Sequence, residues 1–427
     1  MMDGWTTGRE SRRVATTARW RAFAALAGSL LAACTEGAPN PGGTPGTPTP
    51  SISASPSASP SPVPTRPVLT VPSSIQSDCS ADVTRKLLAW IGSVPDGSTL
   101  VFGRKACYRI DGTLRIAGRT DLRFEGNRAT FRAVRRGGRT RHHWWIVGGS
   151  NITLRNMTIR GANPNAGSSN SCFDSSHEHQ HGVALWGVQG ALLESLRIFD
   201  VYGDSVYFGN TGTEPNRNVT VRNGYFRRNG RQGFGIVHGE NITIDRNDVA
   251  DICMTVFDLE PEPETHLRTV TITNNTVGEH RHLFLANSGS RVETSNVFVA
   301  YNRLLGRRGM RWPNGPGSAN PTINVGTAGS RGWVIRNNDF ARFEGTAFRI
   351  VGASGVTVSC NRVRWIFMTG TGVELRSVRS ATIRNDRFVG GSTAVSRFNS
   401  TGVRTSGNRL DDAPLPSSCG TIGPMPA

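Results

Sequence analysis

Several features that mark common protein classes are scarce in this sequence. Long amphipathic helical patterns are rare, which argues against a helical fold. None of the 7 cysteines forms a Cys-x-x-Cys pair, so the signature of a zinc ribbon is missing. Lys86 and Lys105 are the only lysines, so nearly all of the positive charge belongs to arginine. No compact basic run is interleaved with aromatic residues, and we therefore expect no nucleic acid partner.

Glycine, asparagine, threonine, valine and isoleucine recur throughout the chain instead. The chain has 427 residues, of which 50 are glycine and 23 are proline, and its hydrophobic fraction is 37%. This is enough apolar material for one large domain or two ordinary ones. The composition predicts an all-β protein with many short strands. The formal net charge of +18 favours an anionic partner, such as an acidic polysaccharide.

The N-terminus has the order of a secretory signal. Five arginines in residues 9–21 precede the apolar stretch FAALAGSLLAA, residues 23–33, which is too short to span a bilayer. The ending LAAC resembles the lipobox of bacterial lipoproteins. That resemblance implies that residues 1–33 are removed and that Cys34 is lipidated. The mature protein would then be anchored to the outer face of the cytoplasmic membrane, at the cell surface.

Three further parts follow the signal. Residues 34–72 comprise the lipidated cysteine and a tract rich in proline, serine and threonine, which cannot bury a core and should be a disordered, extended linker. Residues 73–420 are the expected globular domain. Residues 421–427 are a C-terminal tail.

A repeated pattern begins near residue 120. Each copy has a strand of alternating apolar residues, an Asn and a second short strand, as in NITLRNMTI, NVTVRNGYF and NITIDRNDV. Ser195 replaces the Asn in one copy, and successive copies lie 23 to 39 residues apart. A drifting period with occasional long insertions is typical of a solenoid. The repeated asparagines are Asn127, Asn156, Asn223, Asn247, Asn275, Asn302, Asn338, Asn361, Asn385 and Asn408.

The repeat favours a right-handed parallel β-helix of about ten or eleven coils. No coil can bury its inner face alone, so neighbouring coils must stack. Asn side chains stacked at the bend can hydrogen-bond along the solenoid and tolerate left-handed backbone. A short helix over residues 80–92, with Ser80 as N-cap and Asp82 in the first turn, could cover the open edge of the first coil.

The chain resembles the right-handed parallel β-helix proteins of the pectate-lyase-like superfamily over roughly residues 95–410. Members of that superfamily include polysaccharide lyases, glycoside hydrolases, epimerases and noncatalytic adhesins. The resemblance implies the fold and leaves the chemistry open.

Six cysteines remain beside the lipobox cysteine, and a location outside the cytoplasm would permit disulfides. We expect one disulfide to staple the N-terminal cap and a second to tie the tail to the last coils. These pairs are Cys79–Cys107 and Cys360–Cys419. Cys172 and Cys253 could pair with each other or stay free.

Aligning the coils places one outward-facing column of side chains on the second group of strands. The segments HGVALW, DSVYFG, QGFGIVHG, TVFDLEPE and RHLFLANS align with their apolar residues inward. Neighbouring coils are about 4.8 Å apart, so side chains in one column can touch. The outward column is Ala184, Tyr207, Gly235, Asp258 and Phe284.

Two pairs in this region could carry chemistry. His181 and Asp204 lie in the turn before adjacent strands, and a His beside an Asp is an oriented base or acid. Asp258 and Glu260 lie two apart on one face, with Cα atoms about 6.6–6.8 Å apart. Inverting glycosidases hold two carboxyl groups about 6.5–9.5 Å apart, so this pair is the acid/base candidate. The alternative is solvated surface for the carboxylates and a structural hydrogen bond for His181.

Candidate substrate-binding residues surround these pairs. Arginines could bind a substrate carboxylate in bidentate fashion, and aromatic rings could stack on sugars. The candidates are Tyr207, Arg231, Gln232, His238, Arg281, His282, Phe284 and Asn287. Two long loops, residues 161–176 and 306–321, could wall a groove over this face.

A metal site is the weaker interpretation of the histidines that precede this strand group. His177, His179 and His181 alternate and could bind a metal together with Glu178. Their segment lies in a serine-rich loop without a second cluster of ligands, so we expect no metal site. Hydrolysis would require no cofactor, whereas a lyase could use calcium.

Family motifs constrain the chemistry further. The polygalacturonase-like hydrolases use three aspartates and a histidine on this kind of face. GDSVYF and GFGIVHG, residues 203–208 and 233–239, are faintly similar to their pattern, but Ser205 stands where those hydrolases have an aspartate. The signature strings of the calcium pectate lyases are absent. Both lysines lie near the N-terminal cap, which disfavours a lyase with a lysine base.

We therefore expect a lipid-anchored, extracytoplasmic, carbohydrate-active protein. An enzyme that hydrolyses an anionic, uronate-containing polysaccharide is favoured. A noncatalytic protein that binds glycan or cell wall, and a lyase that acts by β-elimination, are the alternatives. The sequence leaves the sugar, the linkage and the oligomeric state open.

Overall fold

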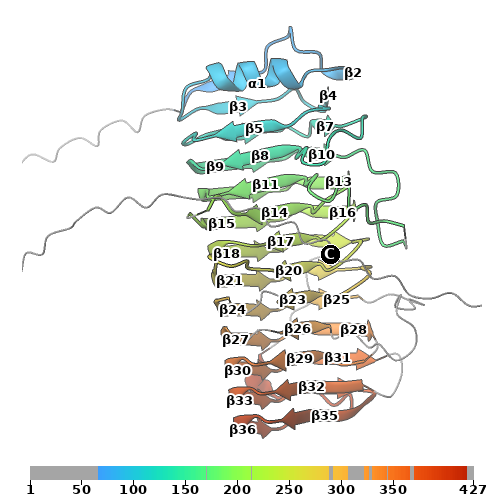
Figure 1. The fold of residues 1–427 in the computed structure, drawn as a ribbon. Coiled ribbons are helices and arrows are strands. Elements are labelled where there is room, and N and C mark those ends of the chain that lie inside the picture. The colour runs from blue at the N-terminus through green and yellow to red at the C-terminus, as the bar shows by residue number, and fades with distance from the viewer. Residues whose placement is uncertain are drawn as a thin grey trace, which may run out of the picture. The chain divides into compact units, whose positions relative to one another are not determined.

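The computed structural model describes residues 66–169, 171–212, 214–287, 292–305, 322–326, 329–343, 345–365 and 370–420. They form a solenoid in which the chain passes repeatedly through three parallel sheets, here called A, B and C (Figure 1). The predicted signal peptide, Cys34, the loop 306–321 and the tail 421–427 lie outside the described residues.

In each coil the chain forms a strand of sheet A, then a strand of sheet B, then a strand of sheet C. Sheet A comprises β1 Val68–Thr70, β3 Thr99–Val101, β6 Arg123–Glu125, β9 Ser150–Arg155, β12 Gln189–Glu194, β15 Asn216–Arg222, β18 Gly239–Asp245, β21 Leu267–Thr273, β24 Thr294–Ala300, β27 Ser330–Arg336, β30 Ser354–Ser359, β33 Arg379–Arg384 and β36 Thr401–Ser406. Sheet B comprises β2 Asp78–Asp82, β4 Cys107–Arg109, β7 Thr130–Arg132, β10 Thr158–Arg160, β13 Arg197–Val201, β16 Tyr225–Asn229, β19 Asp248–Ala250, β22 Thr276–Val277, β25 Arg303–Leu304, β28 Asp339–Phe343, β31 Arg362–Trp365 and β34 Arg387–Val389.

Sheet C faces the viewer in Figure 1 and carries the candidate site. It comprises β5 Leu114–Ala117, β8 Trp144–Val147, β11 Val183–Trp186, β14 Val206–Gly209, β17 Phe234–Ile236, β20 Phe257–Leu259, β23 Leu285–Asn287, β26 Ile323–Val325, β29 Phe348–Val351, β32 Gly370–Arg376 and β35 Gly391–Phe398. Each strand pairs in parallel with its equivalents one coil before and after, giving about eleven turns. The predicted all-β, right-handed parallel β-helix is confirmed.

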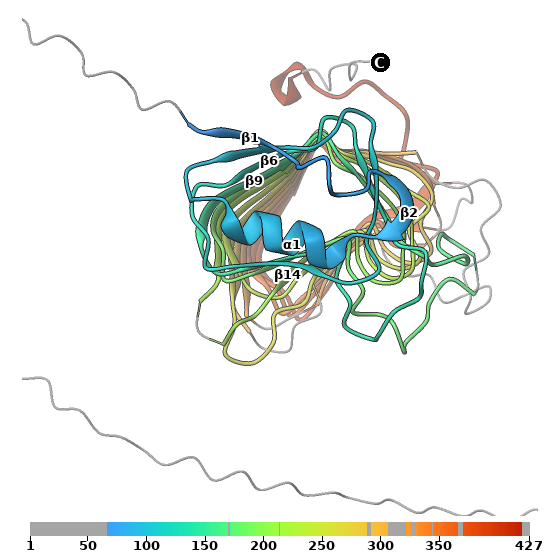
Figure 2. The ribbon, with the colours of Figure 1, turned by 90° about the horizontal axis from the view of Figure 1, so that it is seen from above.

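The N-terminal edge differs in detail from the sequence prediction. Residues 68–70, which we placed in the linker, form β1 and pair with β3. The helix α1 spans Thr84–Ser93 and lies across the first coil, as Figure 2 shows from above. It starts later than predicted because Ser80 and Asp82 belong to β2, which pairs with β4. Asp82 still supports the helix start, since its Oδ1 accepts the backbone N–H of Thr84 at 3.0 Å.

The inward side chains of the three sheets fill the solenoid. Along sheet C, Phe234 stacks on Phe257 with ring centroids 5.3 Å apart, and Phe257 contacts Phe284 at 5.2 Å. Full burial of a large apolar side chain contributes about 1.5–3 kcal/mol to folding. Leu87 and Ile91 of α1 are buried as well, so the helix closes the N-terminal end of this core.

The repeated asparagines form two adjacent columns rather than the single column we predicted. One column is the bend residue itself, which takes a left-handed backbone with φ of 51–60°; its polar members include Asn127, Asn156, Ser195, Asn223 and Asn385. The next residue along the chain points inward and forms the ladder. The ladder residues are Asn247, Asn275, Asn302, Asn338, Asn361, Asp386 and Asn408.

Each amide in the ladder satisfies backbone groups of two coils. Asn302 Oδ1 accepts the backbone N–H and the side-chain Nδ2–H of Asn275, both at 3.0 Å. Asn302 Nδ2 in turn donates to Asn338 Oδ1 at 3.0 Å and to the carbonyl of Ile272 at 2.8 Å. The ladder thus supplies partners for polar backbone groups that are buried at every bend.

Asp386 interrupts the ladder with a carboxyl group. Its Oδ1 accepts from Asn361 as an Asn would, at 2.8 Å from the backbone N and 2.9 Å from Nδ2. Its Oδ2 takes the place of the amide nitrogen and has no hydrogen-bond partner among the described residues. Burial raises the pKa of Asp386 to about 7. An Asn at this position would continue the ladder, and its Nδ2 would donate a hydrogen bond to the backbone carbonyl of Val358.

Replacing Asp386 by Asn should stabilise the protein at alkaline pH. The pKa of Asp386 is higher in the folded than in the unfolded state, so wild-type stability falls as pH rises from about 4 through 7. Asp386→Asn has no carboxyl group to ionise, so its stability does not fall in this way. Its free energy of unfolding should exceed that of the wild type by about 2–4 kcal/mol at pH 8 and differ little from it at pH 4. Urea unfolding between pH 4 and 9 measures the effect, with exposed Asp412→Asn as the control. An equal stability difference at both ends of the range would contradict the prediction.

Three disulfides tie loops and ends to the coils. The predicted pairs Cys79–Cys107 and Cys360–Cys419 are confirmed, with Cα atoms 5.0 and 5.6 Å apart. Cys172 and Cys253, whose state the sequence left open, form the third pair across 81 residues. Such a density of disulfides supports a location outside the cytoplasm. Within the described part of the chain, no helix has the length and apolar character needed to cross a membrane.

Candidate functional site

The turn before the strands of sheet C brings polar residues of successive coils together. Val183, Val206 and Phe234 are in register, so the residues two positions earlier, His181, Asp204 and Gln232, also form a column. The backbone N–H of Asp204 donates to His181 Nδ1 at 3.0 Å, and the backbone N–H of Gln232 donates to Asp204 Oδ1 at 2.9 Å. The predicted proximity of His181 and Asp204 is confirmed, and Gln232 follows them in the same column.

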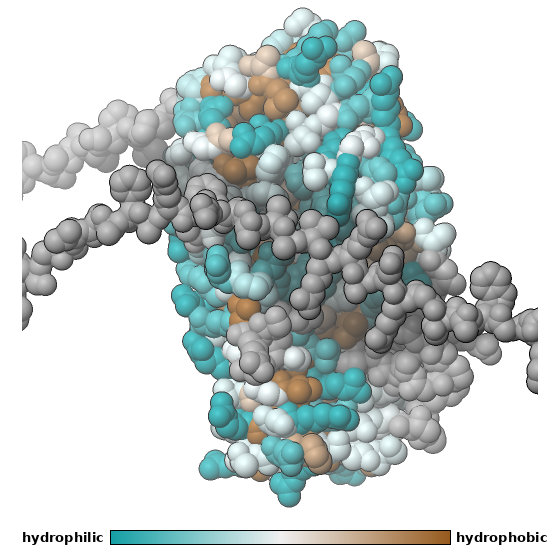
Figure 3. Space-filling model, viewed as in Figure 1, coloured by the Kyte–Doolittle hydropathy of each residue, from teal (hydrophilic) through white to brown (hydrophobic). Residues whose placement is uncertain are grey.

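The outward column of sheet C follows the prediction as far as Asp258. Tyr207, Gly235 and Asp258 are in register, and Ala184 and Trp145 precede them. In the space-filling view, those atoms of this side that grey residues leave visible are mostly hydrophilic or neutral, with smaller apolar patches (Figure 3).

The prediction for the next coil was wrong by two residues. Leu285 pairs with Phe257, so Ala286 follows Asp258 in the outward column. Phe284 is fully buried in the core and cannot stack on a ligand. Asn287 also points inward, where its Nδ2 donates to the carbonyl of Leu259 at 3.2 Å. The run LFLAN fits either register in sequence, because a shift of two residues keeps the alternation of the two faces. In the observed register Phe284 precedes β23 and stands next to Val256, which is also fully buried.

Arg281 and His282 do not continue the column of Gln232. The register places Leu283 next to Thr255, which follows Gln232 in that column. Arg281 instead lies beside the loop disulfide, with Nη1 3.8 Å from the Sγ of Cys172. His282 is half-buried, and burial lowers its pKa. The two residues therefore sit beside the loop rather than in the column of acids.

Three carboxyl groups, one from the coil of β14 and two from the coil of β20, gather around Arg231 and Gln232 of the coil between them. Arg231 Nη1 donates to Asp204 Oδ2 at 2.9 Å, and Arg231 Nη2 donates to Glu260 Oε1 at 3.3 Å. Gln232 Nε2 donates to Asp258 Oδ2, and Gln232 Oε1 accepts from Arg231 Nη1 at 2.8 Å. We call these five residues the acid cluster. The guanidinium of Arg231 is engaged by the cluster instead of projecting toward solvent, as a substrate-binding arginine would.

The members of the acid cluster differ in burial and in acidity. Asp204 is fully buried, and burial raises its pKa to about 7 although Arg231 acts in the opposite direction. Burial also raises the pKa of Glu260, whose side chain remains 25% exposed. Asp258 is 7% exposed. The cluster therefore holds two carboxyl groups of raised pKa, Asp204 and Glu260, on one arginine and beside a third carboxyl group, which suits acid–base chemistry.

His181 is not the oriented base that its position beside Asp204 suggested. Because its Nδ1 accepts a backbone N–H, that nitrogen carries no proton and cannot donate to the Asp204 carboxylate, 3.6 Å away. Burial holds the pKa of His181 well below its usual value. The ring stacks on Tyr207 at 4.3 Å and on His142 at 5.2 Å. His181 thus acts as a neutral aromatic spacer between the acid cluster and the preceding coils.

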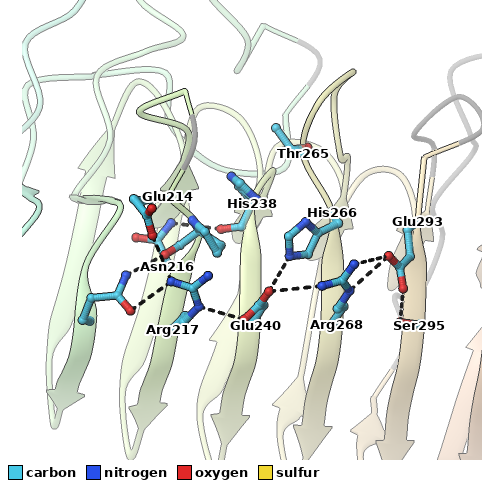
Figure 4. A network of polar contacts seen from close by, with 12 residues as sticks. Glu214, Asn216, Arg217, His238, Glu240, Thr265, His266, Arg268, Glu293 and Ser295 are labelled. Carbon is cyan, nitrogen blue, oxygen red and sulfur yellow. Dashed lines mark hydrogen bonds and ion pairs between the residues drawn. The ribbon is translucent and has the colours of Figure 1, made fainter. Parts of the chain in front are cut away.

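His238 lies at the corner of sheets C and A, outside the acid cluster. Its ring packs edge-on against His266 at 4.7 Å, and burial lowers its pKa to about 4 (Figure 4). Beside it, charged residues alternate across β15, β18 and β21: Arg217 Nε donates to Glu240 at 2.8 Å, and His266 Nε2 lies 2.6 Å from the same carboxylate. This ladder of charges links neighbouring coils, and His238 is part of that corner.

The loop between β10 and β11 reaches the acid cluster. Its described part is fixed by the disulfide of Cys172 and by Ser168 Oγ, which donates to Asp251 Oδ1 at 2.8 Å. Glu178 Oε2 from this loop lies 3.8 Å from Arg231 Nε. The repeat pattern could not indicate that Glu178 joins the cluster, because the loop is an insertion outside the repeat. The loop accordingly flanks one side of the candidate site.

The three alternating histidines do not converge. His177 Nδ1 lies 3.1 Å from Asp174 Oδ2, His179 Nε2 lies 3.7 Å from Glu178, and His181 faces the coils. Across the described ranges, no three His, Cys, Asp or Glu side chains are grouped closely enough to hold a metal ion.

Adding a methyl group at Gly235 should disable the acid cluster without unfolding the protein. A Cβ there would lie 2.5 Å from Asp204 Oδ2 and 3.0 Å from both Gln232 Oε1 and Tyr207 Cδ2. Gly235→Ala should therefore displace the carboxylates and lower any activity of the site about 100-fold. Gly92→Ala adds the same methyl where nothing lies within 4 Å, and it is the control. Unchanged activity in both variants would contradict this geometry.

Comparisons with known proteins agree on the architecture. The family described as "Right handed beta helix region" matches residues 109–260, which include the acid cluster. The chain is a right-handed parallel β-helix protein. The right-handed parallel β-helix that the resemblance implied is thereby confirmed. No curated protein sequence gives a significant match to this β-helix.

Solved structures resemble this β-helix at low sequence identity. The surface protein and adhesin PfbA of Streptococcus pneumoniae is 12% identical, with a TM-score of 0.58 over 81% of this chain and 97% of its own. A family 28 exopolygalacturonase of Yersinia enterocolitica is 11% identical, with a TM-score of 0.48 over 81% and 78%. The catalytic unit of a GH87 alpha-1,3-glucanase of Streptomyces thermodiastaticus is 16% identical, with a TM-score of 0.48 over 86% and 72%. At such identities the likeness concerns the fold alone.

Proposed function

We propose that this β-helix protein hydrolyses glycosidic bonds of an anionic polysaccharide at the acid cluster. The observation that carries the proposal is the convergence of Asp204, Asp258 and Glu260 on Arg231 and Gln232 at one face of sheet C. Hydrolysis of a glycosidic bond uses two carboxyl groups, one as acid and one as base or nucleophile. Glu260, whose pKa is raised, and Asp258, two residues before it, are the pair that would meet this requirement.

The residues of the cluster suit different roles. Glu260 is the most exposed of the three acids, and its raised pKa favours the protonated form that donates to the leaving oxygen. Asp258, two residues away on the same face, would activate the attacking water as a base. Asp204 is fully buried and binds Arg231, so we assign it a positioning role.

The charge of the chain supports an anionic substrate and the disulfides support an extracytoplasmic site of action. The formal net charge is +18, which attracts uronate-containing chains. With lipidation of Cys34, the enzyme would act at the cell surface, held by the linker to the membrane. Hydrolysis of this kind needs no cofactor.

Glycan binding without cleavage is the second candidate function. The burial of Asp204 and Asp258 favours it, because buried carboxylates neutralised by Arg231 also occur in purely structural networks. A lyase receives less support, since burial raises the pKa of Tyr207 and Nδ1 of His181 is occupied by a hydrogen bond. Neither side chain is suited to serve as the base of a β-elimination.

The test is a panel of polysaccharides incubated with the full chain, including polygalacturonate, alginate and neutral glucans, with and without calcium. Reducing ends and ultraviolet absorbance are followed in parallel. New reducing ends without absorbance support the proposal. Absorbance that rises with product identifies a lyase instead, because β-elimination leaves an unsaturated sugar. Binding without product identifies the noncatalytic function.

A further inference from the structure

Aromatic side chains cover the coils that precede the acid cluster. Trp145 of β8 and Trp186 of β11 are partly exposed, and their rings meet edge to face at 5.1 Å. The ring of His142 lies 5.2 Å from Trp145 and 6.1 Å from Trp186. We call Trp145, Trp186 and His142 the aromatic floor. None of the three was singled out as a binding residue by the sequence.

The aromatic floor is continuous with the acid cluster. His142 stacks on His181 with an interplanar angle of 9°, and His181 stacks on Tyr207 with an angle of 12°. Trp145, Tyr207 and Asp258 share one outward column. Four steps of about 4.8 Å, or about 19 Å in all, separate Trp145 from Asp258. One coil step is close to the length of one hexose in an extended chain.

The floor is uncharged, and small residues leave space beside it. Burial lowers the pKa of His142 to about 4, so its ring is neutral at pH 7. Ala184 separates Trp145 from Tyr207 in the outward column. Gly209 lies under the indole of Trp186. A Cβ on residue 209 would come within 2.2 Å of the Nε1 of Trp186. The two indoles can therefore lie close to the sheet, because no other large side chain occupies these positions.

A cation borders the far end of the floor. The guanidinium of Arg115, from β5, lies 5.1 Å from the ring centroid of Trp145. Arg115 is exposed, and an arginine can bind a carboxylate with two parallel hydrogen bonds. An uncharged aromatic surface followed by an arginine is complementary to an acidic sugar, which has apolar ring faces and a carboxylate.

We propose that the aromatic floor binds hexopyranose units of the polysaccharide that enters the acid cluster, with Arg115 binding a uronate carboxylate. This inference rests on the proposed function for the identity of the ligand. Indole rings offer a large rigid surface at low entropic cost, which suits the C–H faces of pyranoses. The floor supplies affinity, whereas the acid cluster supplies chemistry, so the two contributions are separable.

The experiment compares Trp145→Ala, Trp145→Tyr and a control, Trp90→Ala, in the full chain. Trp90 is another partly exposed tryptophan; it lies on α1 and is not part of the outward column, and its ring meets that of Phe102 at 5.7 Å. Affinity electrophoresis in gels that contain polygalacturonate, and in parallel gels with the other polymers of the panel, measures binding without any need for cleavage. We expect Trp145→Ala to weaken binding about tenfold, Trp145→Tyr to restore most of it, and the control to bind like the wild type.

The outcomes separate the two proposals. Normal binding and an unchanged KM for Trp145→Ala, with hydrolysis present, overturn the floor and leave the hydrolase intact. Binding that depends on Trp145, without hydrolysis, supports the floor and overturns the hydrolase. No binding of any polymer by the wild type overturns the floor. If Trp145→Ala fails to fold, protection of wild-type tryptophan fluorescence from acrylamide by polygalacturonate decides, and an absence of protection overturns the floor.

Discussion

Replacing Glu260 by Gln should lower kcat for polysaccharide hydrolysis by about 1,000-fold while the fold is retained. An amide cannot donate the proton that the leaving oxygen requires, but it has nearly the same shape and can still accept from Arg231. Asp258→Asn should cause a loss of similar size, because it removes the base. Reducing-end assays at saturating substrate measure kcat, and thermal unfolding verifies the fold.

The control for this experiment is Glu264→Gln, which changes an exposed glutamate of the same loop. The pH profile adds a readout that a structural role would not move. Since burial raises the pKa of Glu260, wild-type activity should fall as pH rises through that raised value. A Glu260→Gln enzyme with wild-type kcat would remove Glu260 from the chemistry and with it the assignment of the acid.

Replacing Asn302 by Ala should cost about 3–5 kcal/mol of unfolding free energy. The substitution removes the amide that binds Asn275 in one direction and Asn338 in the other. It also leaves the buried carbonyl of Ile272 without its donor. Exposed Asn165→Ala is the matched control and should change stability by less than about 0.5 kcal/mol. Urea titration measures both, and equal effects of the two substitutions would show that the ladder contributes little.

Repetition made the fold and half of the site predictable from sequence. The alternating strands and regular asparagines defined the coils, and the outward column was right from Ala184 to Asp258 because each coil there has the same phase. The prediction failed at Phe284, where a run of five residues fits two registers and only packing chooses between them. The exchange of the two Asn columns has the same origin, since adjacent positions both favour asparagine.

Two of the residues that the sequence missed come from outside the repeat. Glu178 and His142 lie in insertions whose path depends on contacts with distant coils. Arg231 was found, but its role differed: it pairs with Glu178, Asp204 and Glu260, and only the stacked structure brings these three together. A sequence pattern predicts which side chains of a strand point outward. The interactions of a charged side chain such as Arg231 depend on every residue that surrounds it in the folded protein.

Because the step between coils is uniform, distances along one column of the solenoid are multiples of one coil step. Trp145 and Asp258 belong to one column, so the span between them is a whole number of coil steps. Insertion or deletion of one complete coil between them would change that span by about 4.8 Å and leave the register of every other strand intact. Descendants of such a chain could therefore alter the size of the fragment they release in single-sugar increments, without any change to the residues that do the chemistry.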